Sequence, residues 1–186
     1  MRFLVVLVEE ISAKVLLETL LPKLVPPGTS IRVIAFEGKT DLEKEMVRKI
    51  RGWREPDTRF LVMRDQDSGD CRAIKSRLRE LCAQAGKPEA LVRIACHELE
   101  SWYLGDLQAV EESLGPKGIA KDSALAKYRD PDRLGNAAQE LKALTRNAYQ
   151  KVSGSRRIAP LLDLEGRNRS TSFRVFCEGV RKLSAT

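Results

Sequence analysis

The sequence predicts an α/β fold: a mostly parallel four-stranded sheet flanked by helices, with a C-terminal helical annex. Four short apolar runs have strand length and little polar alternation, as strands buried on both faces do. These runs span residues 3–8, 31–36, 60–63 and 91–95. Segments with apolar residues at helical spacing separate them, at 13–24, 42–51 and 71–85. This alternating order favours parallel strands joined by right-handed helical crossovers.

The chain beyond residue 98 shows no strand signal. Helices are predicted near 98–114, 136–149 and 172–183. A length of 186 residues suits one domain with a sizeable core. We therefore expect an α/β core over residues 1–114 and a basic helical extension over residues 115–186 that packs on the core.

Composition describes an ordinary soluble globular protein, with 42% hydrophobic and 32% charged residues. The apolar run at the N-terminus is too short for the core of a signal peptide and far too short to span a bilayer. We therefore expect a cytoplasmic protein. The four cysteines form no C-x-x-C pair, which indicates reduced thiols rather than a zinc site or a disulfide framework.

Positive charge is concentrated at the C-terminal end. Residues 142–186 contain ten Lys or Arg and three acids, which equals the formal net charge of +7 of the whole chain. This distribution predicts an anionic partner, nucleic acid rather than membrane. We expect four arginines to contact nucleic acid phosphates: Arg156, Arg157, Arg167 and Arg169. The alternative is an arginine-rich helical surface that is simply solvated.

Carboxylates follow two of the predicted strands. Asp65 and Asp67 come directly after the apolar run 60–63, and Glu9 ends the run 3–8 in the same way. In open α/β sheets, ligands bind at the carboxyl ends of the strands, so these acids can meet at one site. Hard cations such as Mg²⁺ or Mn²⁺ take oxygen ligands and commonly share them with a phosphate. The trio predicts metal-assisted phosphate chemistry; the alternative is an Asp-rich turn.

Two further acids, Glu98 and Glu100, follow the predicted strand at 91–95. Residues two apart on a helix point to different sides, so only one of them is expected to bind a second metal ion. Glu98 is the first choice because it lies nearer the strand end, and Glu100 is the alternate. Acids in a first helical turn are also favoured by the helix dipole alone.

A competing motif, Glu37-Gly38-Lys39-Thr40, follows the second predicted strand. It resembles the end of a phosphate-binding loop, but that loop needs a Gly where Val33 stands. Thr40 with Glu43 forms a capping box for the next helix, which is a sufficient structural reason for the sequence. We therefore prefer Glu9 to Glu37 as the site glutamate.

These acids resemble those of the Toprim domain found in topoisomerases, primases and related nucleases. Toprim families place a glutamate after the first strand and an Asp-x-Asp at a later strand end, as Glu9 and Asp65-x-Asp67 stand here. Further segments resemble a bacterial domain-of-unknown-function family of small Toprim-like proteins, related to the overcoming-lysogenisation-defect nucleases. These segments are Glu9 to Lys14, Arg64 to Asp67, Glu98 to Asp106 and Ser170 to Phe173.

The resemblance implies a Toprim-like sheet and hydrolysis of a nucleic acid phosphodiester with Mg²⁺ or Mn²⁺. Glu9, Asp65 and Asp67 would hold the metal, and Lys14 or one arginine of the pair Arg156-Arg157 would neutralise transition-state charge. It also implies a separate ATPase partner in phage defence. Two alternatives stay open: a small ribonuclease that trims structured RNA, and a non-catalytic module that docks a partner. The sequence does not determine the oligomeric state.

Overall fold

The computed structural model describes residues 2–121 and 126–185. Within them one sheet forms from four parallel strands in the order β2-β1-β3-β4. The strands are β1 (Phe3–Val8), β2 (Ser30–Ala35), β3 (Thr58–Asp65) and β4 (Leu91–Ala95). Val8 pairs with Ala35 and with Met63, and Asp65 pairs with Ala95, so the carboxyl ends of all four strands lie along one edge. The predicted α/β class and four-stranded sheet are confirmed.

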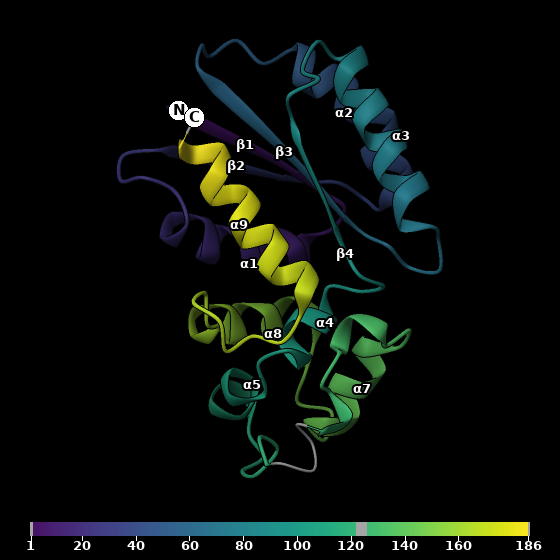
Figure 1. The fold of residues 1–186 in the computed structure, drawn as a ribbon, viewed down its shortest axis with the longest axis vertical. Helices are drawn as coiled ribbons and strands as arrows, with labels where there is room; N and C mark the ends of the chain where they lie inside the picture. The colour runs from purple at the N-terminus through teal and green to yellow at the C-terminus, as the bar shows by residue number, and fades with distance from the viewer. Residues whose placement is uncertain (1, 122–125, 186) are drawn as a thin grey trace.

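Helices flank the sheet and form the part of the chain after β4 (Figure 1). Those between strands are α1 (Ile11–Leu20), η1 (Leu21–Lys23), α2 (Lys39–Arg51) and α3 (Cys71–Gln84). Those after β4 are α4 (Glu100–Leu104), α5 (Leu107–Leu114), η2 (Pro131–Arg133), α7 (Ala137–Leu144), α8 (Lys151–Ile158), η3 (Ala159–Leu161) and α9 (Thr171–Ala185). Thr40 therefore lies in the first turn of α2 behind Gly38, and does not cap the helix as predicted.

Each face of the sheet carries its own hydrophobic core. Side chains alternate across a strand, so Leu4 and Val6 of β1 point to one face and Val5 and Leu7 to the other. The first face packs against α1, α9 and the helices that follow β4. The second face packs against α2 and α3. Burial on both faces explains why the central strands are almost uniformly apolar.

The helices after β4 differ from the predicted ones in two places. The segment 98–114 divides into α4 and α5 at Gly105, where a Cβ atom would lie 2.2 Å from the side-chain oxygen of Asn168. Asp106 then accepts a hydrogen bond from the Ala109 amide at 3.3 Å and begins α5. The segment 136–149 is helical only to Leu144, and α8 was not predicted. The buried residues of α8 are Gly154, Ser155 and Ile158. Only Ile158 is a large apolar residue, so the sequence shows no apolar repeat at helical spacing there.

The helices after β4 bring the C-terminal part of the chain to the sheet. In Figure 1, β4 runs down towards α4, and α4, α5, α7 and α8 gather beyond that end of the sheet. Helix α8 packs on α1, and α9 lies along β4. As a result, residues of the extension stand beside the carboxyl ends of the strands. None of the described helices has the length and apolar character needed to cross a bilayer.

Candidate carboxylate site at the sheet edge

Glu9 and Asp65 meet at the carboxyl ends of two adjacent strands. Glu9 directly follows β1, and Asp65 is the last residue of β3. The parallel register places these strand ends side by side, and the Asp65 amide donates a hydrogen bond to Glu9 Oε2 at 3.3 Å. The Asp65 carboxylate is fixed from the segment between β4 and α4, because the Leu99 amide donates to Asp65 Oδ2 at 3.1 Å.

The loop that carries Asp67 is held against the loop after β4. Asp67 and His97 both adopt left-handed backbone conformations, with φ of 53° and 55°, which Asp and His tolerate better than most residues. The Asp67 amide donates to the His97 carbonyl at 2.7 Å, and His97 Nδ1 lies 3.1 Å from the Asp67 carbonyl. This reciprocal contact positions Asp67 and gives His97 a structural role in the loop.

Two cations lie among the three carboxylates. The Arg64 side chain is only 6% exposed, and its guanidinium lies 3.8 Å from Glu9, 3.7 Å from Asp67 and 2.9 Å from Glu43. Lys39, at the start of α2, contacts Asp67 Oδ2 at 2.8 Å, and this hydrogen bond raises the pKa of Lys39. Sequence reasoning missed both roles. The signal for Lys39 was its place directly after the strand next to β1.

Burial gives two of the carboxyl groups an elevated proton affinity. It raises the pKa of Asp65 well above the ordinary value, and the charges of Glu100, Glu10 and Glu9 add to that effect against the Leu99 hydrogen bond. Burial also raises the pKa of Glu9, although Arg64 opposes it. A cation nearby would stabilise the ionised form of these acids. Carboxyl groups with perturbed pKa values are common at functional sites, so this edge of the sheet is the strongest candidate site.

The structure places Glu98 and Glu100 in different surroundings. Glu98 Oε2 accepts a hydrogen bond from the Ala138 amide at 2.8 Å, at the start of α7. Glu100 is buried and accepts from the Tyr149 hydroxyl at 2.8 Å. The charge of Glu100 reaches Asp65, so it is the nearer of the two in electrostatic terms. Their assignment as second metal ligands stays a prediction.

A lysine of the extension also reaches this edge. Lys151, the first residue of α8, donates to Glu10 Oε2 at 3.0 Å. Glu10 in turn accepts a hydrogen bond from the Ser12 hydroxyl. Lys14, predicted to neutralise transition-state charge, instead lies one turn away from Glu18, at 3.8 Å. Sequence reasoning could not find Lys151, because nothing in the pattern predicted α8.

The predicted phosphate-binding arginines lie in the extension with partners of their own. Arg167 forms a two-pronged ion pair with the fully buried carboxylate of Asp106, at 2.9 Å and 3.0 Å. Arg157 donates to the Ser113 carbonyl. Arg156 and Arg169 are exposed. The contacts of Arg157 and Arg167 therefore lead to residues other than Glu9, Asp65 and Asp67, and the contact of all four arginines with nucleic acid stays a prediction.

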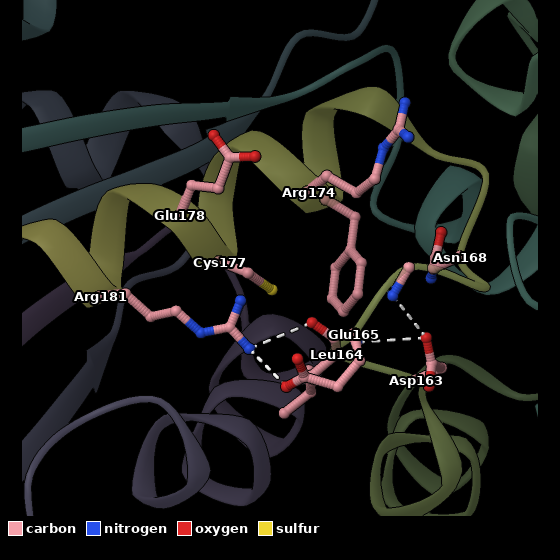
Figure 2. Close-up of a pocket in the computed structure, with 10 residues that line it drawn as sticks. Asp163, Leu164, Glu165, Asn168, Arg174, Cys177, Glu178 and Arg181 are labelled. Carbon is pink, nitrogen blue, oxygen red and sulfur yellow. Dashed lines mark hydrogen bonds and ion pairs between the residues drawn. The ribbon is translucent and has the colours of Figure 1, made fainter.

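A small cavity of about 110 Å³ lies away from the carboxylates, between the loop 163–168 and α9. Figure 2 shows Arg181 turned across it to Glu165, at 2.8 Å, and to the Leu164 carbonyl, at 3.1 Å. Asp163 closes the loop by accepting from the amides of residues 165–167. These internal contacts explain the cavity as part of the loop's own packing.

Comparison with known proteins decides the family. Residues 8–181 match the family described as domain of unknown function DUF4276. The chain belongs to this family. Among solved structures it is similar to the C-terminal region of the Xanthomonas campestris pv. campestris OLD protein, with 14% identity and a TM-score of 0.54. That similarity covers 98% of this chain and 95% of the other, so the two share a fold. No curated protein matches the chain.

The donor set of this DUF4276 chain suits a hard divalent cation, because Glu9, Asp65 and Asp67 offer only oxygen ligands. Because burial raises the pKa of Glu9 and of Asp65, a metal ion would have to replace a proton there, and its binding would depend on pH. In the part of the chain that the structure describes, no three Asp, Glu, His or Cys side chains are grouped closely enough to hold an ion. Arg64 and Lys39 are the charges now in contact with these acids.

Proposed function

We propose that this chain is a metal-dependent phosphodiesterase of the Toprim type that hydrolyses nucleic acid. The observation that carries the proposal is the placement of Glu9, Asp65 and Asp67 at or just beyond the carboxyl ends of two adjacent parallel strands, where Arg64 contacts both Glu9 and Asp67. The fold shared with the OLD protein region supports it, because the sequence motifs resemble the same group of proteins. That resemblance also supports a separate ATPase as partner and phage defence as the setting.

In this proposal the three carboxylates hold one or two Mg²⁺ or Mn²⁺ ions. Bound there, such ions supply polarisation of the phosphoryl oxygens and a water of lowered pKa. A cation held there would oppose the burial that raises the pKa of Asp65 and would favour its ionised form. Arg64 keeps Glu9 and Asp67 oriented from a buried position, and the Glu43 carboxylate at 2.9 Å fixes its guanidinium.

Two further residues of the chain have roles in this proposal: Lys39 as a positive charge for the phosphate and His97 as a positioning residue. Lys39 is half-exposed and contacts Asp67, so its ammonium group stands where an incoming phosphate would need a positive charge. His97 is held by its backbone and by the Asp67 carbonyl, which suits a positioning role.

The ion pairs around Arg64 and Lys39 favour a second candidate function. They already neutralise much of the negative charge of Glu9 and Asp67, as expected of a module whose acids only fix its loops. Such a module would bind a partner without cleaving nucleic acid. The two candidates differ in one measurable property, which is metal-dependent cleavage.

The test measures cleavage of labelled DNA and RNA by the purified protein with Mg²⁺ or Mn²⁺, and again with chelator. Asp67→Asn removes a ligand, and Asp57→Asn is a matched control, because Asp57 has the same φ of 53° at the opposite end of β3. We expect the wild type and the control to cleave equally. Asp67→Asn should lose at least about 100-fold, the equivalent of roughly 3 kcal/mol of transition-state stabilisation. Equal activity of both variants, or no metal-dependent cleavage by the wild type, refutes the proposal.

A further inference from the structure

A groove runs along the outer edge of β4, the last strand of the sheet. It comprises two hollows that share Arg93 as a wall. The first, about 450 Å³, lies between the start of α3 and the start of α9, and the second, about 650 Å³, continues along β4 and α9. Figure 1 shows β4 between α9 and α3. Cys71 and Cys96 line the first hollow, so the groove begins beside the loops that carry Asp67 and His97.

Five cations line this groove: Arg133 pairs with Asp130 at 2.8 Å, Lys182 lies on α9, and the other three come from α3 and β4. Lys75 and Arg79 project from α3 and Arg93 from the middle of β4. Among the described residues, no carboxylate lies within ion-pair distance of any of the three. Burial and then the charges of Arg93 and Arg79 lower the pKa of Lys75, as expected for like charges held together without a counterion.

Three of the four acids near the groove are already engaged elsewhere. Asp132 accepts from the Ser172 amide at 2.6 Å and from the Ser170 hydroxyl at 2.7 Å, which fixes the first turn of α9. Asp130 pairs with Arg133 at 2.8 Å, and Glu89 in the second hollow lies 3.8 Å from Lys87. The charge of the fourth acid, Glu178 of α9, reaches Arg93. Five cations face these four acids, so the groove keeps a net positive charge.

Arg93 is held in the groove by the absence of a side chain on α9. Its guanidinium crosses α9 at Gly179, where a Cβ atom would lie 2.2 Å from Arg93 Nη2. Arg93 Nε donates to the Val175 carbonyl at 3.2 Å. A larger residue at Gly179 would displace this guanidinium, so the glycine determines where the charge stands.

We propose that this groove binds the phosphate backbone of a nucleic acid, with Lys75, Arg79 and Arg93 contacting successive phosphates. The inference rests on the proposed function, because it places the substrate strand beside the carboxylate site. Lysine and arginine groups that have no carboxylate partner commonly contact phosphate oxygens, and these contacts position a strand without reading its sequence. The groove lies apart from the arginines of residues 156–169, so the two surfaces can be tested separately.

The test measures binding of labelled single-stranded and duplex oligonucleotides by fluorescence anisotropy, in chelator so that no cleavage occurs, over a range of salt concentrations. The groove variant is Lys75→Gln/Arg79→Gln/Arg93→Gln. Its control, Lys44→Gln/Lys49→Gln/Arg54→Gln, removes three exposed charges that lie outside the groove. For a single strand we expect the groove variant to lower the slope of log affinity against log salt by about 0.7 per lost contact. For three contacts this is on the order of 100-fold in affinity per decade of salt, so the loss should be largest at the lowest salt concentration. The control should match the wild type.

Gly179→Ala provides a test that removes no charge. It should weaken binding as much as Arg93→Gln, and it should add nothing in the Arg93→Gln background. The inference is refuted if the groove variant keeps the wild-type affinity and salt slope, or if the wild type binds neither oligonucleotide. If the wild type cleaves nucleic acid and the groove variant binds it with normal affinity, the groove is not the binding surface, and the proposed function is unaffected. A groove that binds in a protein without metal-dependent cleavage refutes the proposed function instead.

Discussion

The hydroxyl of Tyr149 is the donor that stabilises the buried Glu100 carboxylate, and its removal gives a measurable cost. Tyr149 and Glu100 are each about 1% exposed, and the hydrogen bond between them is 2.8 Å long. Burial and the charge of Glu100 raise the pKa of Tyr149, so the hydroxyl stays protonated and donates. Tyr149→Phe leaves Glu100 without this donor. Hydrogen bonds to charged groups contribute about 1.5–3 kcal/mol.

A second buried tyrosine provides the control. Tyr103 donates to the Ser155 hydroxyl at 2.7 Å, so Tyr103→Phe removes an equally buried but uncharged hydrogen bond. That loss should cost about 1 kcal/mol. For a domain of this size, 1 kcal/mol shifts Tm by about 2–4 °C. We therefore expect thermal unfolding to show a fall of about 3–12 °C for Tyr149→Phe and about 2–4 °C for Tyr103→Phe.

The pH dependence of the difference identifies Glu100 as its cause. Burial raises the pKa of Glu100 in the folded state, so the folded state binds its proton more tightly than the unfolded state does. Its contribution to stability is therefore greatest below the unfolded pKa and is lost as pH rises through the folded pKa. Only the ionised carboxylate forms a charged hydrogen bond, so the two variants should diverge across that interval. Equal costs for both variants at every pH refute the reasoning.

The remaining predictions concern the metal and the extension. Mn²⁺ at about 100 times its Kd should stabilise the wild type by about 2.7 kcal/mol, and should not stabilise Glu9→Gln/Asp65→Asn; equal shifts in Tm would place the ion elsewhere. The folded-state pKa values of Glu9 and Asp65 are raised, so the metal-free protein should lose stability as pH rises through these pKa values. Its affinity for Mn²⁺ should increase over the same pH range, because the ion no longer competes with a proton. Calorimetry at several pH values measures both effects. Arg167→Gln leaves Asp106 buried without its partner and should cost about 2–3 kcal/mol in urea unfolding, below the full cost of a buried pair because Arg167 is partly solvated. Arg156→Gln, an exposed control, should change stability by about 0.5 kcal/mol or less.

The sheet could be predicted because its strands are buried on both faces. The runs 3–8 and 91–95 agree with β1 and β4 at both ends. The prediction for β3 was too short, since Arg64 and Asp65 are polar residues that still belong to the strand. Arg64 is buried by ion pairs that come from other parts of the chain, and no local pattern contains that information.

The same reasoning explains what could be predicted of the site. Strand-end position suffices for Glu9 and Asp65, because parallel register fixes which ends are neighbours. It does not suffice for Glu98 or Glu100, whose partners Ala138 and Tyr149 come from segments that local periodicity predicted poorly. Tyr149 follows the end of α7 and packs against Gly154 of α8, so its position depends on packing between helices.

The two cations at the carboxylate site differ in how easily an ion could take their place. Arg64 is buried, and its pair with Glu43 at 2.9 Å holds it independently of Glu9 and Asp67. Lys39 is half-exposed and has a flexible side chain, so solvent can replace its contact with Asp67 at little cost. Under the proposed function, Asp67 would therefore exchange Lys39 for a divalent cation, and Arg64 would stay in position. The Lys39 ammonium group would then be free to contact a phosphate oxygen of the substrate.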